Sequence, residues 1–250
     1  MKNLLTLITL LALIFNFSSC GDDDPAVVNY KIMEMKMVDL SRQDTINYSF
    51  SYAEGRLTQA TISGSNINES YTATYDANGK VSEAGDKRFE WDGDKLVKII
   101  DDNGIWIDLT YDGSDPLNGE IKQFDNNNEI VNIGALAISN SDGNLNRIEQ
   151  FNISNQSLTR HTFSLFDNRT NMFRSIWWFH YVGETLGAFR SGILPDALFM
   201  NYNPASYKYE LPSQSFERTI LYTYSYDGEG RVEHVEYTVG TDDFELIIYY

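Results

Sequence analysis

The residues best suited to bind a ligand are aromatic and lie close together late in the chain. Residues 177–181 read Trp-Trp-Phe-His-Tyr, and Tyr202 follows after a short gap. Sugar rings stack on aromatic faces while their hydroxyls need polar partners, so aromatic rings near carboxylates suit a saccharide site. If the segment holds a site, we expect Trp178, Tyr181 and Tyr202 to contact the ligand. The alternative is a buried helix, because a helix that is apolar nearly all round lies in a core.

Other chemistry has weak support in this sequence. His161, His180 and His234 show no metal-ligand spacing, and we expect them on strand or helix surfaces, with no metal and no cofactor. There is no Gly-x-Ser-x-Gly elbow, no phosphate loop and no cysteine nucleophile after residue 20. We therefore expect no catalytic residues and no enzyme. A hydrolase with two facing carboxylates remains open, because strands bring distant residues together.

Three acidic segments offer oxygen ligands for calcium, at residues 92–94, 101–104 and 142–146. None of them matches a complete EF-hand loop. Asp, Asn and Gly are also the residues that tight turns require. We favour the turn interpretation.

One short phrase recurs along the chain and predicts its architecture. An aromatic residue ends an alternating run, a turn rich in Asp, Asn and Gly follows, and a basic or apolar residue starts the next run. Clear copies span residues 50–57, 75–81 and 226–232, and weaker ones span 91–96, 111–113 and 124–130. Such a pattern is typical of successive β-hairpins. It predicts an all-β, antiparallel meander that forms a curved sheet or a partial barrel.

The expected strands share period-2 alternation of apolar and polar residues. They span residues 27–38, 46–52, 57–62, 71–75, 89–91, 96–100, 105–111, 121–124, 130–138, 145–153, 162–166, 220–226, 232–238 and 244–250. The period-2 alternation stops between Phe166 and Pro212. The pattern there predicts a short helical insert at about residues 170–200, with an N-terminal cap in residues 168–171. We expect this insert to cap or plug the sheet.

The start of the chain has the features of an export signal. Lys2 precedes an apolar run over residues 4–17 that is short for a transmembrane helix, and Ser18 and Ser19 precede Cys20, the single cysteine. This arrangement resembles the lipobox of bacterial lipoproteins, which implies cleavage before Cys20 and lipid on its sulfur and amino group. We expect a signal peptide over 1–19, an acidic tether over 20–26 and one β domain over 27–250.

The charge balance excludes one class of partner. The chain has 19 Lys and Arg against 36 Asp and Glu; loss of Lys2 with the signal leaves 18 against 36, or −18. Nucleic acid binding requires cations that neutralise phosphates, so no nucleic acid partner is expected. The expected partners are the membrane, through lipid on Cys20, and a glycan or an envelope protein.

Two family resemblances follow from these motifs. The phrase at residues 75–81 and 226–232 looks like the tyrosine-aspartate repeat of Rhs-type surface proteins. The lipobox, the hairpins, residues 166–173 and the aromatic insert together resemble Bacteroidetes-type lipoproteins of unknown function with a porin-like fold. Met172 replaces the proline of that family's phrase, and Arg169 and Thr170 replace its lysines. The resemblance implies a curved antiparallel sheet or barrel and no activity.

Acidic residues directly after Cys20 resemble the surface-export signal of the same lipoproteins. We therefore expect a lipid-anchored outer-membrane protein that faces the cell surface. Its expected function is non-catalytic binding of a glycan or another extracellular polymer. The alternative is a structural partner of an outer-membrane complex, bound through a sheet edge or the concave face. A membrane-spanning barrel is disfavoured, because strands such as 46–52 are short and their second faces are polar.

Overall fold

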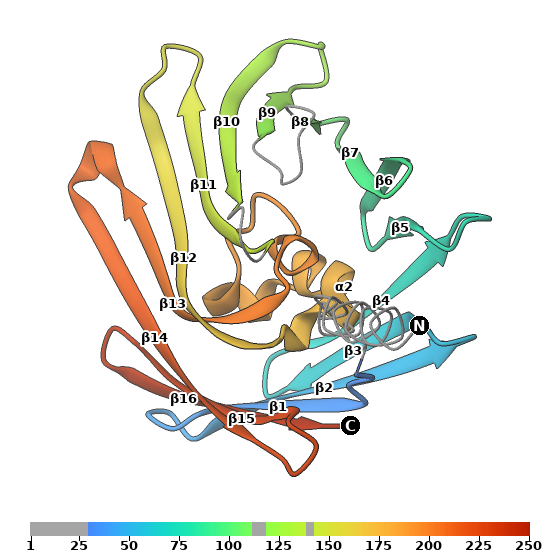
Figure 1. Ribbon diagram of the computed structural model, residues 1–250, viewed down its shortest axis with the longest axis vertical. Helices are drawn as coiled ribbons and strands as arrows, with labels where there is room; N and C mark the ends of the chain where they lie inside the picture. The colour runs from blue at the N-terminus through green and yellow to red at the C-terminus, as the bar shows by residue number, and fades with distance from the viewer. Residues whose placement is uncertain (1–29, 112–118, 139–142) are drawn as a thin grey trace, which may run out of the picture.

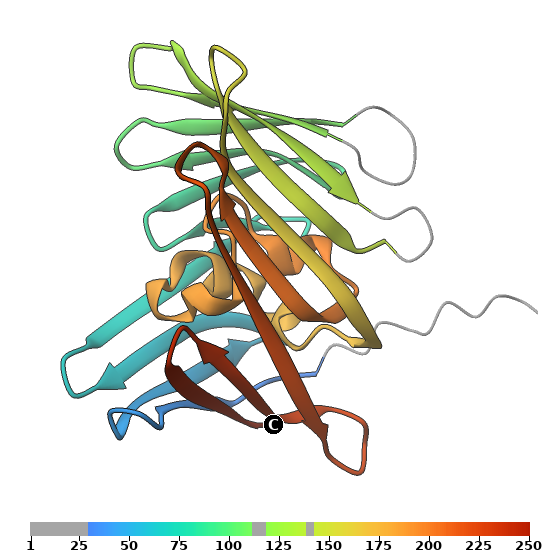
Figure 2. The same ribbon diagram turned by 90° about the vertical axis from the view of Figure 1, so that its left-hand side faces the viewer.

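The part of the chain that the structure describes forms one closed antiparallel barrel. The computed structural model describes residues 30–111, 119–138 and 143–250. The expected signal peptide (1–19), the acidic tether (20–26), Cys20 and Asp142 lie outside these ranges. Figures 1 and 2 show the strands as a wall around a group of short helices.

The strands follow one another around the wall in the order of the sequence. Their bounds are β1 Glu34–Asp39, β2 Asp44–Ala53, β3 Arg56–Gly64, β4 Asn68–Tyr75, β5 Val81–Ala84, β6 Lys87–Asp92, β7 Lys95–Asp101, β8 Trp106–Tyr111, β9 Gly119–Phe124, β10 Ile130–Ile138, β11 Leu145–Asn152, β12 Ser157–Thr170, β13 Tyr202–Leu211, β14 Phe216–Tyr226, β15 Val232–Val239 and β16 Asp242–Tyr249. The predicted meander of hairpins is therefore confirmed.

The closure of the barrel differs from the sequence-based expectation of a curved sheet or a partial barrel. β1 pairs with β16 in antiparallel register, with Met35 opposite Ile248 and Met37 opposite Leu246. The 16 strands thus form a ring without a free edge. The expectation fell short because this last pairing joins the two ends of the domain, and no local sequence pattern encodes it.

The recurring phrase builds the same turn in several hairpins. The Asp76 carboxylate accepts hydrogen bonds from the backbone N–H groups of Asn78 and Lys80 at 2.9 and 2.8 Å. Gly79 then adopts φ +80°, which a residue with a side chain rarely does. Asp125, Asn152 and Asp227 accept the same pair of bonds. These side chains therefore serve as turn formers, as the sequence indicated.

The aromatic residue of the phrase links each hairpin to its neighbour at one rim of the barrel. Tyr75 Oη donates a hydrogen bond to the carbonyl oxygen of Leu57 at 2.6 Å, and Arg56 lies over the Tyr75 ring at 5.5 Å. We refer to this pair of contacts as a rim clamp. Further clamps join Tyr52 to Lys31 and Ile32, Trp91 to Lys80 and Val81, Tyr111 to Lys95 and Leu96, and Tyr250 to Arg231 and Val232.

The insert between β12 and β13 fills the middle of the barrel (Figure 1). It contains a 3-10 helix Met172–Ile176, the α-helix α2 Trp177–Val182 and the 3-10 helices Glu184–Phe189 and Asp196–Phe199. We refer to residues 171–201 as the plug. Its predicted position and its cap are confirmed, since the Asn171 side chain accepts from Phe173 N–H. The sequence-based break reached Pro212, however, and so missed strand β13.

The plug's side chains contact the wall on several sides. Phe179 lies edge-on to Phe50 of β2, with ring centroids 5.3 Å apart, and Trp177 meets Phe89 of β6 at 5.3 Å. Phe189 stacks on Tyr222 of β14 at 4.9 Å. The apolar inner face of the wall is thus buried against apolar plug residues. None of the described helices is both long enough and apolar enough to cross a membrane.

The outer face of the wall is mostly polar, with scattered exposed apolar side chains such as Leu165 and Leu221. Across neighbouring strands, Ser49 meets Thr61 at 2.5 Å, Gln59 donates to Ser70 at 3.0 Å, and Lys208 pairs with Glu217 at 2.9 Å. β2 reaches 10 residues and is longer than predicted, but β5 has 4 residues and β1, β6, β8 and β9 have 6 each. Strands this short still argue against a membrane span, which needs about 9–11 residues a strand. Polarity argues against it too, because a lipid-facing barrel wall needs an apolar band.

Loss of one rim clamp should destabilise the protein modestly. Tyr111→Phe removes the 2.6 Å bond to the Leu96 carbonyl, which should cost about 0.5–1.5 kcal/mol. The melting temperature should fall by roughly 2–4 °C per kcal/mol. Tyr249→Phe is the matched control, because Tyr249 is exposed at the same rim. Equal melting of Tyr111→Phe and wild type in calorimetry would show that the clamp adds no stability.

Candidate functional site

The plug leaves one cavity toward each end of the barrel. One cavity has a volume of about 720 Å³ and lies at the end of the barrel that carries the β7–β8 and β13–β14 turns; we call it the distal cavity. The other has a volume of about 560 Å³ and lies at the opposite end, where the plug joins β12 and β13; we call it the proximal cavity. Both volumes fall in the range typical of small-ligand sites.

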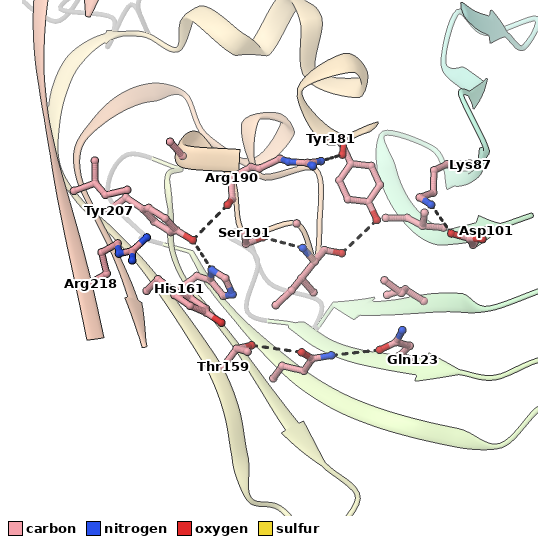
Figure 3. Close-up of a pocket in the computed structure, with 18 of the residues that line it drawn as sticks. Lys87, Asp101, Gln123, Thr159, His161, Tyr181, Arg190, Ser191, Tyr207 and Arg218 are labelled. Atoms are coloured by element: carbon pink, nitrogen blue, oxygen red, sulfur yellow. Dashed lines mark hydrogen bonds and ion pairs between the residues drawn. The ribbon is translucent and has the colours of Figure 1, made fainter. Parts of the chain in front are cut away.

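Strands β12 and β13 supply an aromatic wall of the distal cavity (Figure 3). His161 and Tyr209 lie opposite each other across the two strands, with ring centroids 5.1 Å apart. Tyr207 stacks on Phe163 behind them at 5.1 Å. Tyr209 is half-buried, so part of its ring remains accessible on the cavity side.

A chain of hydrogen bonds orients His161. Its Nδ1 lies 2.8 Å from Tyr207 Oη, which donates to the Arg190 carbonyl oxygen at 3.3 Å. Since a carbonyl only accepts, the Tyr207 proton points to Arg190 and His161 Nδ1 carries its own proton. Nε2 is then an acceptor. Burial lowers the pKa of His161 to about 4, which keeps the ring neutral at physiological pH.

Amide and hydroxyl groups line the next part of the wall. Gln150 Nε2 donates to Gln123 Oε1 at 3.3 Å, and Thr159 Oγ1 donates to Gln150 Oε1 at 3.4 Å. Asn132 Nδ2 donates to the same Gln123 oxygen at 2.8 Å. These bonds fix the side chains of β9, β11 and β12 in one row that faces the cavity. The row offers neutral donors and acceptors at fixed positions.

The opposite wall carries an ion pair. The Lys87 ammonium contacts the carboxylates of Asp101 and Asp86. Burial disfavours the charged lysine, but the two carboxylates outweigh it and raise the pKa of Lys87. In the same way the Lys87 contact outweighs burial and lowers the pKa of Asp101. Both groups therefore stay charged and paired near neutral pH.

The plug closes the cavity from the inside. Arg190, Ser191, Gly192 and Ile193 line it, and Tyr181 Oη donates to the Ile193 carbonyl at 3.4 Å. Behind this segment the buried Asp196 carboxylate accepts from the Ser191 hydroxyl at 2.7 Å and from the Ser191 N–H. Burial raises the pKa of Asp196 to about 7. The carboxyl thus holds the cavity floor in place.

The three residues expected to contact a ligand do not form one site. Trp178 is 1% exposed, and its indole N–H donates to the Leu57 carbonyl at 3.2 Å, so it packs as core. Tyr181 is 6% exposed and lines the distal cavity. Tyr202 is half-buried at the start of β13, where its N–H donates to Asn144 Oδ1 at 2.9 Å. It is not among the residues that line either cavity.

The histidines are placed differently from the expected surface positions. His161 and His180 are buried, and only His234 is partly accessible. His234 lies on the outer wall beside Glu236 and Glu245, with Nδ1 and Nε2 3.9 and 3.7 Å from their carboxylates. These groups offer ligand atoms close enough together for a metal ion. Spacing did not reveal the cluster because Glu245 comes from the neighbouring strand.

Comparison with known proteins supports the fold. A porin-like protein from Bacteroides uniformis has a solved structure with a TM-score of 0.52 and 16% identity, over 86% of this chain and 95% of that one. A porin-like protein from Bacteroides vulgatus gives a TM-score of 0.44 and 10% identity, over 88% and 98%. The TcdB2-TccC3-TEV structure gives a TM-score of 0.32 and 11% identity, over 81% of this chain and 10% of that one.

At these identities the first likeness shows a shared barrel fold, and the two with lower TM-scores carry no argument. No family model matches the chain. No curated protein matches it either. The class that the fold defines is therefore a porin-like antiparallel barrel with an internal plug.

Removal of the Asp196 carboxylate should change how stability depends on pH. An unfolded aspartate titrates near pH 4, whereas buried Asp196 titrates at about 7. The unfolded state therefore binds fewer protons between these values, and Asp196 makes stability fall as pH rises from about 4 to 7.

Asp196→Asn removes this dependence. We expect the stability of wild type relative to the variant to decline over that window, by an amount on the order of a few kcal/mol. Urea unfolding at pH 4.5, 6 and 8 measures the difference, and contributions from His161 and His180 cancel in it. A difference that stays constant with pH would contradict the raised pKa.

Proposed function

We propose that this chain is a non-catalytic, lipid-anchored protein of the outer membrane that binds a saccharide chain in its distal cavity. The observation that carries the proposal is the cavity itself. It places the Tyr209 ring, the neutral His161 and the Gln123–Gln150 amide row around one open volume.

The uncharged groups of this cavity suit a neutral sugar, and the charged Lys87, Asp101, Arg190 and Arg218 lie around them in the lining. The partly accessible Tyr209 ring offers a surface for an apolar sugar face. Gln123, Gln150 and Thr159 offer donors and acceptors that are already held by one another, so little side-chain entropy is lost on binding. His161 Nε2 adds an acceptor for a hydroxyl. Fixed polar groups beside an aromatic wall are typical of sites that orient a small polar ligand.

The placement of the chain's start supports the proposed orientation. The Tyr30 ring meets Tyr250 at 5.8 Å, at the proximal rim. Cys20 lies ten residues before Tyr30 (30 − 20 = 10), and a chain of that length spans at most about 35 Å. Lipid on Cys20 would hold the proximal end toward the membrane. The distal cavity would then open away from it.

The acidic group in the distal cavity favours binding over hydrolysis. A glycosidase needs one carboxyl group that is protonated near neutral pH. Asp101 contacts Lys87, and its pKa is lowered, so it stays ionised. It can accept hydrogen bonds from a ligand but has no proton to donate. Asp196 has a raised pKa, but it is fully buried and does not line the cavity, so it does not reach a ligand.

The alternative of a structural partner loses support at both of its expected contacts, the sheet edge and the concave face. A partner strand requires an unpaired sheet edge, and the described strands form a closed ring. The plug also packs against the concave face and leaves only the two cavities open. Saccharide binding is therefore the better-supported function.

Substitution of the aromatic wall should weaken saccharide binding. We expect Tyr209→Ala to lower the affinity for a bound neutral oligosaccharide at least tenfold, or about 1.4 kcal/mol, and Gln150→Ala to act in the same direction. Calorimetric titration of neutral oligosaccharides of several linkages measures both effects. Tyr249→Ala, on the outer wall, is the control. Failure of every neutral oligosaccharide to bind wild type would refute the proposal.

Loss of the anchor should release the protein from the membrane. Cys20→Ser removes the thiol that lipid requires, so the variant should lose incorporation of labelled palmitate and move to the soluble fraction. Ser19→Ala keeps a small residue before Cys20 and should behave as wild type. If Cys20→Ser remains in the membrane fraction after a carbonate wash, the chain is held there by something other than this lipid.

A further inference from the structure

The proximal cavity is lined by cations from both the plug and the wall. Lys80, Lys95 and Arg174 line it, together with Asp94, Trp91 and Trp177. The chain as a whole has a formal charge of −17, so an excess of cations around this cavity runs against the overall balance. A local positive field in an acidic protein attracts anions to one place.

The charge in this cavity is only partly neutralised within the described residues. Lys80 pairs with Asp94 at 2.5 Å. Arg174 is half-buried and donates to the Asn201 amide oxygen, and no described carboxylate lies within ion-pair distance of it. Burial lowers the pKa of Arg174, as expected for a cation without a counter-charge. A guanidinium in such a position is costly unless an anion joins it.

Lys95 adds a second cation of this kind. It lies over the Tyr111 ring at 5.6 Å as part of a rim clamp and forms no ion pair with the residues that the structure describes. Lys95 is exposed, so its side chain is free to move toward a ligand in the cavity. Arg174 comes from the plug and Lys95 from the wall, and both line the same volume. An anion there would contact both elements.

We propose that the proximal cavity binds a saccharide that carries an acidic substituent, with Arg174 and Lys95 as the groups that recognise its charge. A guanidinium matches the two oxygens of a carboxylate or a sulfate ester. Trp177 and Trp91 give the cavity apolar walls against which a sugar ring packs. A volume of about 560 Å³ accommodates a ligand larger than a bare ion. The proposal does not depend on binding at the distal cavity.

The test uses calorimetric titration of the mature chain with trigalacturonate, with galactose 6-sulfate and with neutral galactotriose. We expect at least one acidic ligand to bind at least tenfold more tightly than galactotriose. Arg174→Gln should weaken that binding at least tenfold, and Lys95→Met severalfold. Tyr209→Ala, in the distal cavity, should leave the affinity for the acidic ligand unchanged. A failure of the proximal-cavity proposal can therefore be told from a failure of the distal-cavity proposal.

Lys31→Met is the matched control. Lys31 lies over Tyr52 at 5.7 Å in an equivalent rim clamp but does not line the cavity. It should leave the affinity for the acidic ligand unchanged. An equal loss in Lys31→Met and Lys95→Met would mean that net charge alone is responsible, which overturns the proposal. Equal affinity for acidic and neutral ligands would overturn it too. If Arg174→Gln lowers the melting temperature severely, the proposal is judged on the affinities of Lys95→Met and Lys31→Met for the acidic ligand.

Discussion

Filling of the barrel interior is the constraint on which the structure depends. A closed ring of 16 strands is wider than its own inward side chains can fill. The plug supplies the missing apolar volume, with Phe179, Trp177 and Phe189 each packed against a different part of the wall. Because the plug is shorter than the barrel, it leaves one cavity at each end. Both candidate sites follow from this partial filling.

The repeated hairpin phrase holds the same structure together at its rim. Each copy places a cation and a carbonyl beside the ring of the next hairpin, as Arg56 and Leu57 do for Tyr75. Trp178 of the plug donates to that same Leu57 carbonyl. The rim clamps therefore tie neighbouring hairpins to each other and, at this point, to the plug. Lys80 and Lys95 belong to clamps and also line the proximal cavity, so one motif both packs the rim and supplies the cations of this cavity.

Local features of this fold could be predicted from the sequence, and features that depend on distant pairings could not. Alternation and turn residues predicted the hairpins, and Asn171 with the aromatic run that follows it predicted the plug. The β1–β16 pairing had no local signal, because it joins strands from the two ends of the domain. Strand β13 was missed because Tyr202–Leu211 directly follows an irregular segment. The distal cavity shows the same limit. Gln123, Gln150 and His161 lie on separate strands, so only the register of the strand pairs from β9 to β12 brings them together.

The wall of this barrel presents polar residues to the outside, while its apolar residues face the plug. The most direct measurement is light scattering on the mature chain without lipid, from Gly21 onward, in buffer without detergent. We expect a monodisperse monomer with one cooperative melting transition, because the outer pairs such as Ser49–Thr61 and Lys208–Glu217 are already suited to water. A chain that aggregates until detergent micelles are added would show that the outer wall is apolar in effect, and would contradict the claim.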